Sequence, residues 1–500
     1  MKRTQTLLFL AVFLSLAALD HSSTGWNLNT RLGLVFAVVD EGTLQIDAYH
    51  DVAPTRTMDK SVYEGHYYSD KVIGLPMLAI PIYAAMRVIW GAFGAEPGFY
   101  QANYLLRVVV VSSAAGISAV LLFRLLLLLG AEAKRAILAV VFTVFGSLFY
   151  GYASVFYPYV PGVASGLTAL WLIASPGSGS LTGARSFAIG SLCGFAVLCD
   201  FIFGIIVIGL ALLYLVRLGS ESEWFSWPSA ATAFPSRCDG RAGLARLGLA
   251  ALGGAIPLSI FAAYAYSIFG HFAIPYEFVA LPEYRKGMAQ GFMGVGAPQI
   301  NALWYLTVHP LRGLFFWSPV LLFALAGCLY QIRSRGLERL IGILGIYTLI
   351  GYLLFNSGYF MWWGGWAMGP RLMLPIFIAF PLGLAYFCRL ERSSRVWGSV
   401  AALGIVSIAL TLPVSLLDPQ VPQFYSDRHY RNLRIGDSVR TPAFRSVKFF
   451  YNLGWRVADR EDPSVPKSVS LGAACLIPAI LIPIAIRSLP GRRDRSRNKP

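Results

Sequence analysis

Long apolar segments follow one another along almost the whole chain, and this feature constrains the fold more than any other. Crossing the hydrocarbon core of a bilayer takes about 20 apolar residues in a helix, and segments near that length recur from the N-terminal to the C-terminal part. Hydrophobic residues make up 56% of the chain and charged residues 13%, against about 25% charged residues in soluble domains. The pattern excludes a soluble globular domain and predicts an all-α polytopic membrane protein with about 12–13 transmembrane helices. The segments lie near 5–20, 74–94, 104–129, 136–152, 158–175, 184–200, 202–217, 245–269, 312–331, 338–355, 370–389, 397–415 and 469–487.

The net charge of +16 is carried in short loops and in the C-terminal tail, which argues against nucleic acid as a partner. Arginine clusters between apolar segments are typical of cytoplasmic loops. They predict a single membrane domain over 1–490 in the inner (plasma) membrane and a basic cytoplasmic tail over 491–500. The long segments 21–73, 270–311 and 416–468 are then extracytoplasmic, and 21–73 is a large first external loop. The clusters are Arg333, Arg335 and Arg339; Arg389, Arg392 and Arg395; and Arg492, Arg493, Arg495, Arg497 and Lys499.

The number of apolar segments conflicts with this topology. Both termini are expected in the cytoplasm, but an odd number of complete crossings would place them on opposite sides. One segment between residues 74 and 135 is therefore not a simple span. Segment 74–94 contains Pro76, Pro81 and Arg87, and we predict a half-helix there, because broken backbone at membrane depth is tolerated where it lines a cavity.

The cysteines and histidines indicate neither a disulfide framework nor a metal centre. The six cysteines form no CxxC pair and lie mostly in apolar segments, where they are expected to be small buried hydrophobes. His21, His50 and His66 share the first external loop, but their spacing matches no usual metal motif. No cofactor is expected to be required, although a divalent metal stays open.

Polar residues concentrate in the loop 21–73, and that loop ends on an acid–amine pair next to the membrane. Tyr67-Tyr68-Ser69-Asp70-Lys71 runs directly into an apolar segment. This arrangement suits transfer of a sugar from a polyprenyl phosphate, which presents its anomeric carbon just outside the bilayer. Such a transfer needs a carboxylate to take the proton of the acceptor and fixed positive charge to stabilise the departing phosphate. Charges within the apolar segments are sparse, unlike those of ion-coupled transporters.

Three stretches of the chain resemble bacterial members of the GT-C glycosyltransferase superfamily, which includes protein O-mannosyltransferases and the aminoarabinose transferase of lipid A. The resemblance implies inverting, metal-independent or weakly metal-dependent transfer from a lipid-phosphate sugar at the external face. Hydropathy and the large first loop match over most of the chain. The first stretch runs from Arg31 through Ile46-Asp47 and Tyr67-Tyr68-Ser69-Asp70-Lys71 to Gly74 and Pro81. The second runs from Gly291-Phe292-Met293-Gly294 through Pro310-Leu311-Arg312-Gly313 to Ser318-Pro319. The third is Trp362-Trp363-Gly364-Gly365 with Gly369-Pro370-Arg371 and Pro375.

The resemblance also implies roles for particular residues. Asp70 and Lys71 are similar to an acid–lysine pair of the aminoarabinose transferase, in which the lysine lies near the donor phosphate. Family members tend to carry a catalytic aspartate just after the first helix, but the matching stretch here holds Asn27 and Asn29 and no acid. The role then passes to Asp20, Asp47 or Asp59, and Asp47 is slightly favoured because it lies in the Ile-Asp-x-Tyr match.

The expected site therefore combines carboxylates with cations from several segments. The catalytic candidates are Asp47, Asp59 and Asp70, and the substrate-binding candidates are Lys71, Arg371, Arg31, Tyr68 and Arg312. Lys71 and Arg371 are expected to hold the donor phosphate, with Arg31 and Arg312 as replacements. The expected partners are a polyprenyl-phosphate sugar donor, membrane lipids, and an acceptor that is a lipid, a glycan or a protein. Two alternatives stay open: a transporter or flippase of a lipid-linked glycan, and an inactive membrane scaffold.

Overall fold

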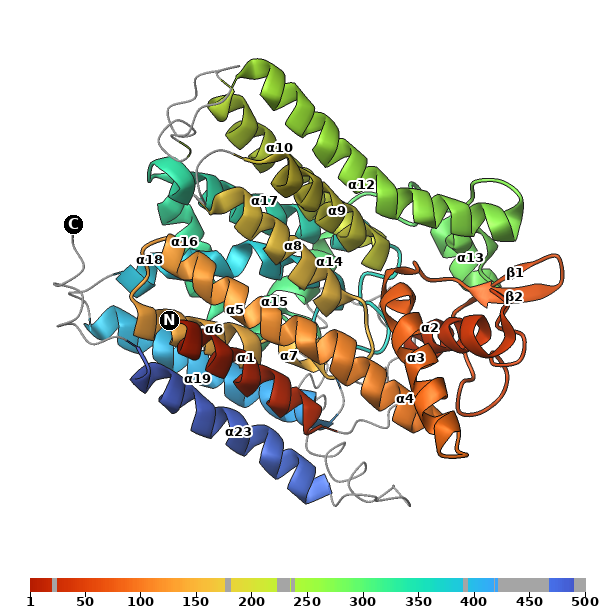
Figure 1. The fold of residues 1–500 in the computed structure, drawn as a ribbon. Helices are drawn as coiled ribbons and strands as arrows, with labels where there is room; N and C mark the ends of the chain where they lie inside the picture. Colours follow the sequence, from red (N-terminus) through yellow and green to blue (C-terminus); the bar gives the residue numbers. More distant parts are fainter. Residues whose placement is uncertain are drawn as a thin grey trace.

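The computed structural model describes residues 1–19, 25–175, 181–222, 234, 239–389, 394–417, 419–420 and 467–489. These residues form a bundle of helices with one small two-stranded sheet at one end (Figure 1). Among the described residues, six helices are long and apolar enough to cross a membrane, or seven if the bent helix pair over 371–389 counts as one span. The predicted fold class, an all-α polytopic membrane protein, is confirmed. Fewer helices than expected reach full spanning length, because other apolar segments form shorter helices such as α8 (Tyr159–Ala174) and α9 (Gly183–Cys199).

The remaining elements follow in chain order from the first loop to α19. The first loop contains α2 (Trp26–Phe36), η1 (Ala37–Glu41), β1 (Lys60–Tyr63) and β2 (His66–Ser69), and α3 (Gly74–Ala92) follows it. Next come α4 (Phe99–Leu106), η2 (Arg107–Ser112), α5 (Ser113–Leu128), α6 (Ala133–Phe145), α7 (Leu148–Ala153), η3 (Phe201–Phe203), α10 (Gly204–Glu221) and α12 (Gly240–Phe269). The second half contains η4 (Pro275–Phe278), α13 (Pro282–Met288), α14 (Ile300–Thr307), α15 (Leu314–Trp317), α16 (Leu321–Ile332), α17 (Gly336–Gly358), η5 (Arg371–Ile378), η6 (Phe380–Gly383), α18 (Leu384–Arg389) and α19 (Ser394–Leu417).

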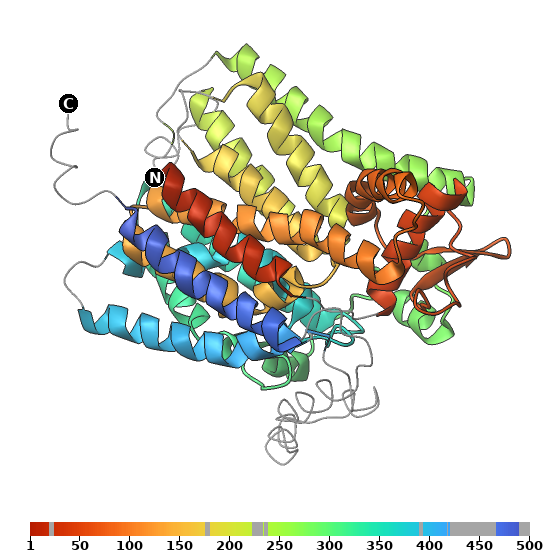
Figure 2. The ribbon, with the colours of Figure 1, turned by 60° about the horizontal axis from the view of Figure 1, so that its bottom comes forward.

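The first and last helices, α1 (Lys2–Ala17) and α23 (Lys467–Arg487), pack side by side in opposite directions (Figure 2). The hydroxyls of Thr4 and Ser488 lie 2.9 Å apart, and Ser15 donates to the carbonyl of Ala474 at 2.7 Å. The start of α1 and the end of α23 therefore lie at the same end of the bundle. The expected tail 491–500 and most of the expected loop 416–468 lie outside the described residues.

Contacts at the other end of α1 settle how the segment 74–94 runs. Tyr104 donates to the carbonyl of Ala17 at 2.6 Å, and Arg107 donates to that of Leu16 at 2.9 Å. The chain thus leaves the bundle after α1 and re-enters it through α4 at the same end, so the elements between them together add no net crossing. The expected half-helix is nevertheless wrong, because α3 is one unbroken helix of 19 residues with Pro81 inside it. The broken backbone lies instead at 371–389, where two helical pieces meet at 48°.

The loops 21–73 and 270–311 meet at this end of the bundle, where Figure 1 shows the hairpin beside α13. β1 and β2 pair antiparallel with Lys60 opposite Ser69 and Tyr63 opposite His66. Ser61 on β1 donates to the carbonyl of Pro275 at 2.6 Å. The hairpin is therefore fastened to the second loop, and residues far apart in the sequence share one end of the molecule.

Glycines allow α9 and α12 to pack backbone to backbone. A Cβ added at Gly190 would lie 1.9 Å from the carbonyl oxygen of Ala250, and one added at Gly253 would lie 2.2 Å from that of Phe187. Such close approach of helices across small residues is typical of membrane bundles. The pair positions the end of α9, on which part of the candidate site rests.

Gly190→Ala is expected to destabilise the protein, because the new methyl group would meet rigid backbone. Overpacking typically costs about 1–3 kcal/mol of the free energy of unfolding. Gly248→Ala, on the same helix pair, is the matched control, since a Cβ at Gly248 meets nothing within 4 Å among the described residues. The midpoint of thermal unfolding of the detergent-purified protein, followed by tryptophan fluorescence, measures both variants. Equal midpoints for the two would contradict the close packing.

Candidate functional site

The register of the hairpin brings two carboxylates together. Lys60 pairs with Ser69, so the residues just beyond that pair, Asp59 before β1 and Asp70 after β2, are neighbours across the two strands. Lys71 comes next in the chain, and its Nζ lies 2.8 Å from Asp70 Oδ2 and 3.0 Å from Asp59 Oδ2. The side chains of Lys71 and Asp70 are 11% and 4% exposed, and that of Asp59 is 23% exposed. One ammonium group thus bridges two carboxylates, and Asp59 is the more accessible of the two.

Helix α3 begins three residues after Lys71, at a point where it packs closely against another helix. A Cβ added at Gly74 would lie 2.4 Å from the carbonyl oxygen of Leu198 near the end of α9. Glycine at this position lets the start of α3, which follows the hairpin, pack against the backbone at the end of α9. The Asp59–Lys71–Asp70 group is therefore fixed at the junction between the first loop and the apolar helices.

Aromatic and cationic side chains from other elements surround the group. The Lys71 Nζ lies 5.5 Å from the centre of the Tyr276 ring, which the second loop supplies. Arg31 on α2 is 1% exposed and donates from Nη1 to the carbonyl of Val72 at 2.8 Å. Arg371, at the start of η5, lies with its guanidinium carbon 5.8 Å from the centre of the Tyr157 ring. A contact of this kind is a cation–π interaction, and the site is therefore rich in fixed positive charge.

Asp200 completes the charged surroundings from the turn between α9 and η3, where it accepts a hydrogen bond from the amide of Ile202 at 3.2 Å. The positive charges of Arg31, Lys71 and Arg371 all act on this carboxylate. In the sequence Asp200 is an embedded charge without a role, and no motif points to Tyr276.

The protonation of the bridged group is determined by its burial. Burial, the largest effect, raises the pKa of Asp70 from its ordinary 3.8 to about 6, although Lys71 lowers it. Burial lowers the pKa of Lys71, but the carboxylates of Asp59 and Asp70 more than offset this and hold it well above its ordinary value. Lys71 is therefore a permanent cation at neutral pH, and Asp70 exchanges its proton near pH 6.

The pH dependence of stability should show the titration of Asp70. Between about pH 4 and pH 6 the folded chain keeps a proton that the unfolded chain has released, so the free energy of unfolding falls as the pH rises. Lys71 adds nothing in this window, because its raised pKa acts only above about pH 10.5. Asp70→Asn cannot titrate, and its unfolding midpoint should lack this fall. Thermal unfolding of both proteins from pH 4 to pH 7 checks it, and parallel profiles would contradict the assigned pKa.

Two buried atoms of the site have no hydrogen-bond partner within the described part of the chain, namely Asp70 Oδ1 and Arg371 Nε. Buried polar atoms are nearly always paired, and exceptions call for an explanation. A bound substrate offers one, since a hydroxyl can donate to the carboxyl oxygen and a phosphate oxygen can accept from the guanidinium.

The other predicted site residues lie in different surroundings. Asp47 binds His66 Nδ1 and the amide of Tyr67, both at 2.7 Å, and so supports the hairpin. Tyr68 is buried, and Gln45 donates to its hydroxyl at 3.5 Å. Arg312 donates to the carbonyls of Trp363 and Gly365 at 2.8 and 3.0 Å and so holds the loop that leads to Arg371. Asp20 lies outside the described residues.

No group of three histidine, cysteine or acidic side chains placed to hold a metal occurs among the described residues. His50 Nδ1 instead accepts a hydrogen bond from Lys60 Nζ at 2.7 Å, and His66 pairs with Asp47. The third candidate, His21, is not among the described residues.

Solved structures of two membrane proteins are similar to this chain over nearly its full length. The crystal structure of ArnT from Cupriavidus metallidurans in the apo state is 15% identical, with 97% of this chain and 76% of that chain covered and a TM-score of 0.48. ArnT bound to undecaprenyl phosphate is 12% identical, with coverages of 97% and 77% and a TM-score of 0.46. The Archaeoglobus fulgidus oligosaccharyltransferase in the apo form is 14% identical, with coverages of 95% and 64% and a TM-score of 0.43.

ArnT and the oligosaccharyltransferase are both members of the GT-C superfamily, which the three motif stretches resemble. No family model matches the chain, and no curated protein matches it. Since all three TM-scores lie below 0.5, the functional proposal rests on the side chains of this protein.

Proposed function

We propose that this protein is a membrane glycosyltransferase that moves a sugar from a polyprenyl-phosphate donor to an acceptor at the extracytoplasmic face of the inner membrane. The observation that carries the proposal is the Lys71 ammonium held between Asp59 and Asp70 at 3.0 and 2.8 Å. A cation fixed where the first loop meets the apolar helices suits an anionic leaving group at the membrane surface. A partly exposed carboxylate beside it suits proton removal from an acceptor.

Each charged side chain has a distinct role in the proposed reaction. The acceptor oxygen attacks the anomeric carbon and forms the new glycosidic bond, and its proton passes to the carboxylate of Asp59. The bond between the anomeric carbon and the phosphate oxygen breaks, and its electron pair leaves with the polyprenyl phosphate. Attack from the face opposite the leaving group inverts the anomeric centre. Lys71 stabilises the charge that develops on the phosphate, and Asp70 positions Lys71.

Arginines add to the positive charge around the phosphate. Arg371 offers a planar guanidinium that can bind two phosphate oxygens at once. Arg31 contributes its charge without binding the phosphate through Nη1, because that nitrogen donates to the Val72 carbonyl. These cations supply the charge stabilisation that a divalent metal provides in other transferases, so the proposal requires no metal. The sugar and the class of acceptor stay open at this point.

The experiment that tests the proposal uses the purified chain in nanodiscs with a radiolabelled polyprenyl-phosphate mannose and a mixed envelope-lipid acceptor. Transfer releases polyprenyl phosphate and moves the label to the acceptor. A transporter or flippase would instead move the intact donor between leaflets. A scaffold would leave the donor both intact and in place. Intact donor under conditions in which it binds the protein would overturn the proposed transfer.

A further inference from the structure

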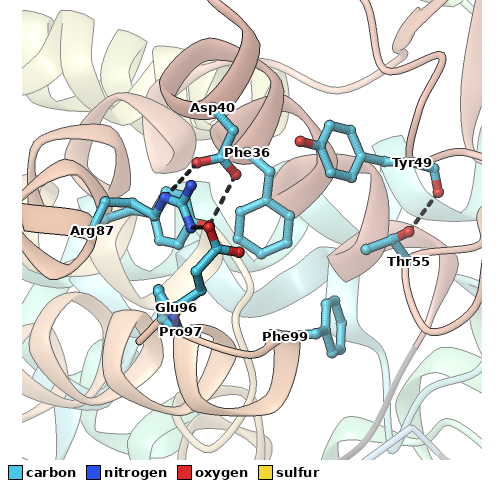
Figure 3. Close-up of a pocket in the computed structure, with 9 residues that line it drawn as sticks. Phe36, Asp40, Tyr49, Thr55, Arg87, Glu96, Pro97 and Phe99 are labelled. Atoms are coloured by element: carbon cyan, nitrogen blue, oxygen red, sulfur yellow. Dashed lines mark hydrogen bonds and ion pairs between the residues drawn. The ribbon is translucent and has the colours of Figure 1, made fainter. Parts of the chain in front are cut away.

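A cavity lies beside the first loop, and its lining does not include Asp59, Asp70 or Lys71. It has a volume of about 350 Å³ and lies between η1, α3, the start of α4 and the loop around Tyr49 and Thr55 (Figure 3). Volumes of this order are typical of small-molecule sites. No sequence motif marks this cavity, and none of the residues that line it has a role in the transfer proposed above.

One wall of the cavity is aromatic. The Phe36 ring lies 4.8 Å from that of Tyr83, 5.8 Å from that of Tyr49 and 6.2 Å from that of Phe99, measured between ring centres. All four rings line the cavity. Flat aromatic surfaces bury the apolar face of a ligand while polar groups around them fix its orientation.

The other wall carries charges with capacity for further hydrogen bonds. Arg87 Nε lies 2.9 Å from Asp40 Oδ1, Arg87 Nη1 lies 3.3 Å from Glu96 Oε1, and Tyr83 donates to Asp40 Oδ2 at 3.0 Å (Figure 3). A guanidinium has five donors and each carboxylate about four acceptor sites, so these contacts leave several groups for a ligand. Two carboxylates against one guanidinium make the cavity net negative. The negative charge disfavours phosphates and carboxylates, and the remaining hydrogen-bond donors and acceptors suit the hydroxyl groups of a ligand.

The cavity opens beside a surface suited to lipid. Next to Arg87 on α3, Val88 and Ile89 are 74% and 53% exposed, and Phe93 beyond the helix end is 83% exposed. Large exposed apolar side chains in a row are typical of contact with a membrane or a partner. Because α3 is apolar enough to lie within a membrane, this exposed apolar face is suited to contact with lipid.

From these features we infer that the cavity is a binding site for the non-anionic sugar headgroup of a membrane glycolipid. The aromatic wall takes the apolar face of the sugar ring, Asp40, Glu96 and Arg87 take its hydroxyls, and the exposed face of α3 lies along its acyl chains. This inference rests on the proposed function in one respect: the bound glycolipid is the acceptor, which makes the acceptor a lipid-linked glycan and not a protein.

Photolabelling of the full chain in nanodiscs tests the binding site without requiring turnover. The probe is an alkyl β-glucoside with a diazirine on the chain next to the sugar, and mass spectrometry locates the labelled peptides. Two comparison probes carry the same chain with a phosphate or with a plain hydroxyl. The glucoside is expected to label the peptides covering 36–55 and 83–99 at least about fivefold more than the phosphate probe, since charge repulsion near a surface is worth about 1 kcal/mol or more. It should also label them more than the hydroxyl probe, which lacks the sugar ring and its hydroxyl groups. Equal labelling by the hydroxyl probe would show a merely apolar cleft and would overturn the inference, as would preferential labelling by the phosphate probe.

Variants assign the labelling to the polar wall. Arg87→Met removes the guanidinium donors and should reduce glucoside labelling to the level of the hydroxyl probe. Asp40→Asn keeps the shape of the side chain and removes one negative charge. The phosphate probe should then label the cavity more strongly, and its labelling should come closer to that of the glucoside. Glu283→Gln, an exposed acid on α13 outside the cavity, is the control and should change neither. Unfolding midpoints confirm that each variant is folded. Wild-type labelling in Arg87→Met would overturn the inference, whatever the transfer assay shows.

Discussion

Replacing Lys71 with methionine is expected to abolish most donor binding and nearly all transfer. Methionine keeps most of the length and loses the ammonium group that faces Asp59 and Asp70 at 3.0 and 2.8 Å. Hydrogen bonds to charged groups are worth about 1.5–3 kcal/mol, or roughly 10- to 150-fold in affinity. Loss of charge stabilisation in the transition state costs a further factor of about 10²–10³ in kcat. Binding of polyprenyl phosphate by the purified protein and the rate of transfer measure the two losses separately.

Controls separate the loss of a phosphate ligand from a loss of structure. Lys71→Met leaves two adjacent carboxylates without their cation, and this is expected to destabilise the loop. The double variant Lys71→Met with Asp70→Asn removes one of them and should recover stability without recovering donor binding. Lys286 is an exposed lysine on α13, at the same end of the molecule. The control variant Lys286→Met should bind the donor and transfer the sugar as the unchanged protein does. Unaltered donor affinity in Lys71→Met would assign the phosphate to Arg371 or Arg31.

Asp59→Asn is expected to reduce kcat by about 10²–10⁴-fold, the usual effect of removing a general base. The amide keeps the shape of the carboxylate and cannot take a proton, so donor binding should change far less than turnover. Single-turnover transfer with saturating donor measures the chemical step. A pH profile that loses its acidic limb in Asp59→Asn would identify Asp59 as the group that must be deprotonated.

Asp47→Asn is the matched variant for this test. The sequence slightly favours Asp47 as the base, but its carboxylate binds His66 and the amide of Tyr67. Its loss should therefore lower the stability of the hairpin and leave kcat nearly unchanged in the folded protein. Full activity in Asp59→Asn together with an inactive, folded Asp47→Asn would reverse this assignment.

Asp47 and Asp59 differ in a way that the sequence alone does not reveal. The acid–amine pair at 70–71 is visible in the sequence because it directly precedes an apolar segment, and the structure adds Asp59 to it. That addition depends on strand register, since a shift of one residue in the pairing of Lys60 with Ser69 would place a different side chain beside Lys71. Register depends on tertiary contacts such as that of Ser61 with Pro275, which the sequence pattern does not contain.

Helix α3 shows a similar limit for the fold. Hydropathy predicts the membrane class, because every crossing needs an apolar segment, and it also marks 74–94 as apolar. It does not distinguish a segment that crosses the bilayer from one that lies at its surface, since both environments favour the same residues. The contact of Tyr104 with Ala17 adds what hydropathy lacks, because it brings the chain back to the end of the bundle from which it left.

The pairing of α1 with α23 has a consequence for biogenesis. Ser15 on the first helix has its carbonyl partner on the last, 459 residues later. During synthesis α1 enters the bilayer long before α23 is made. Until then the Ser15 hydroxyl can pair with that of Tyr150, but the side of α1 that packs on α23 faces lipid or another protein. The helix bundle around α1 is therefore complete only after α23 has been translated. Chains that stop before residue 467 are expected to present an open, polar edge within the membrane, where quality-control proteases recognise incompletely assembled helices.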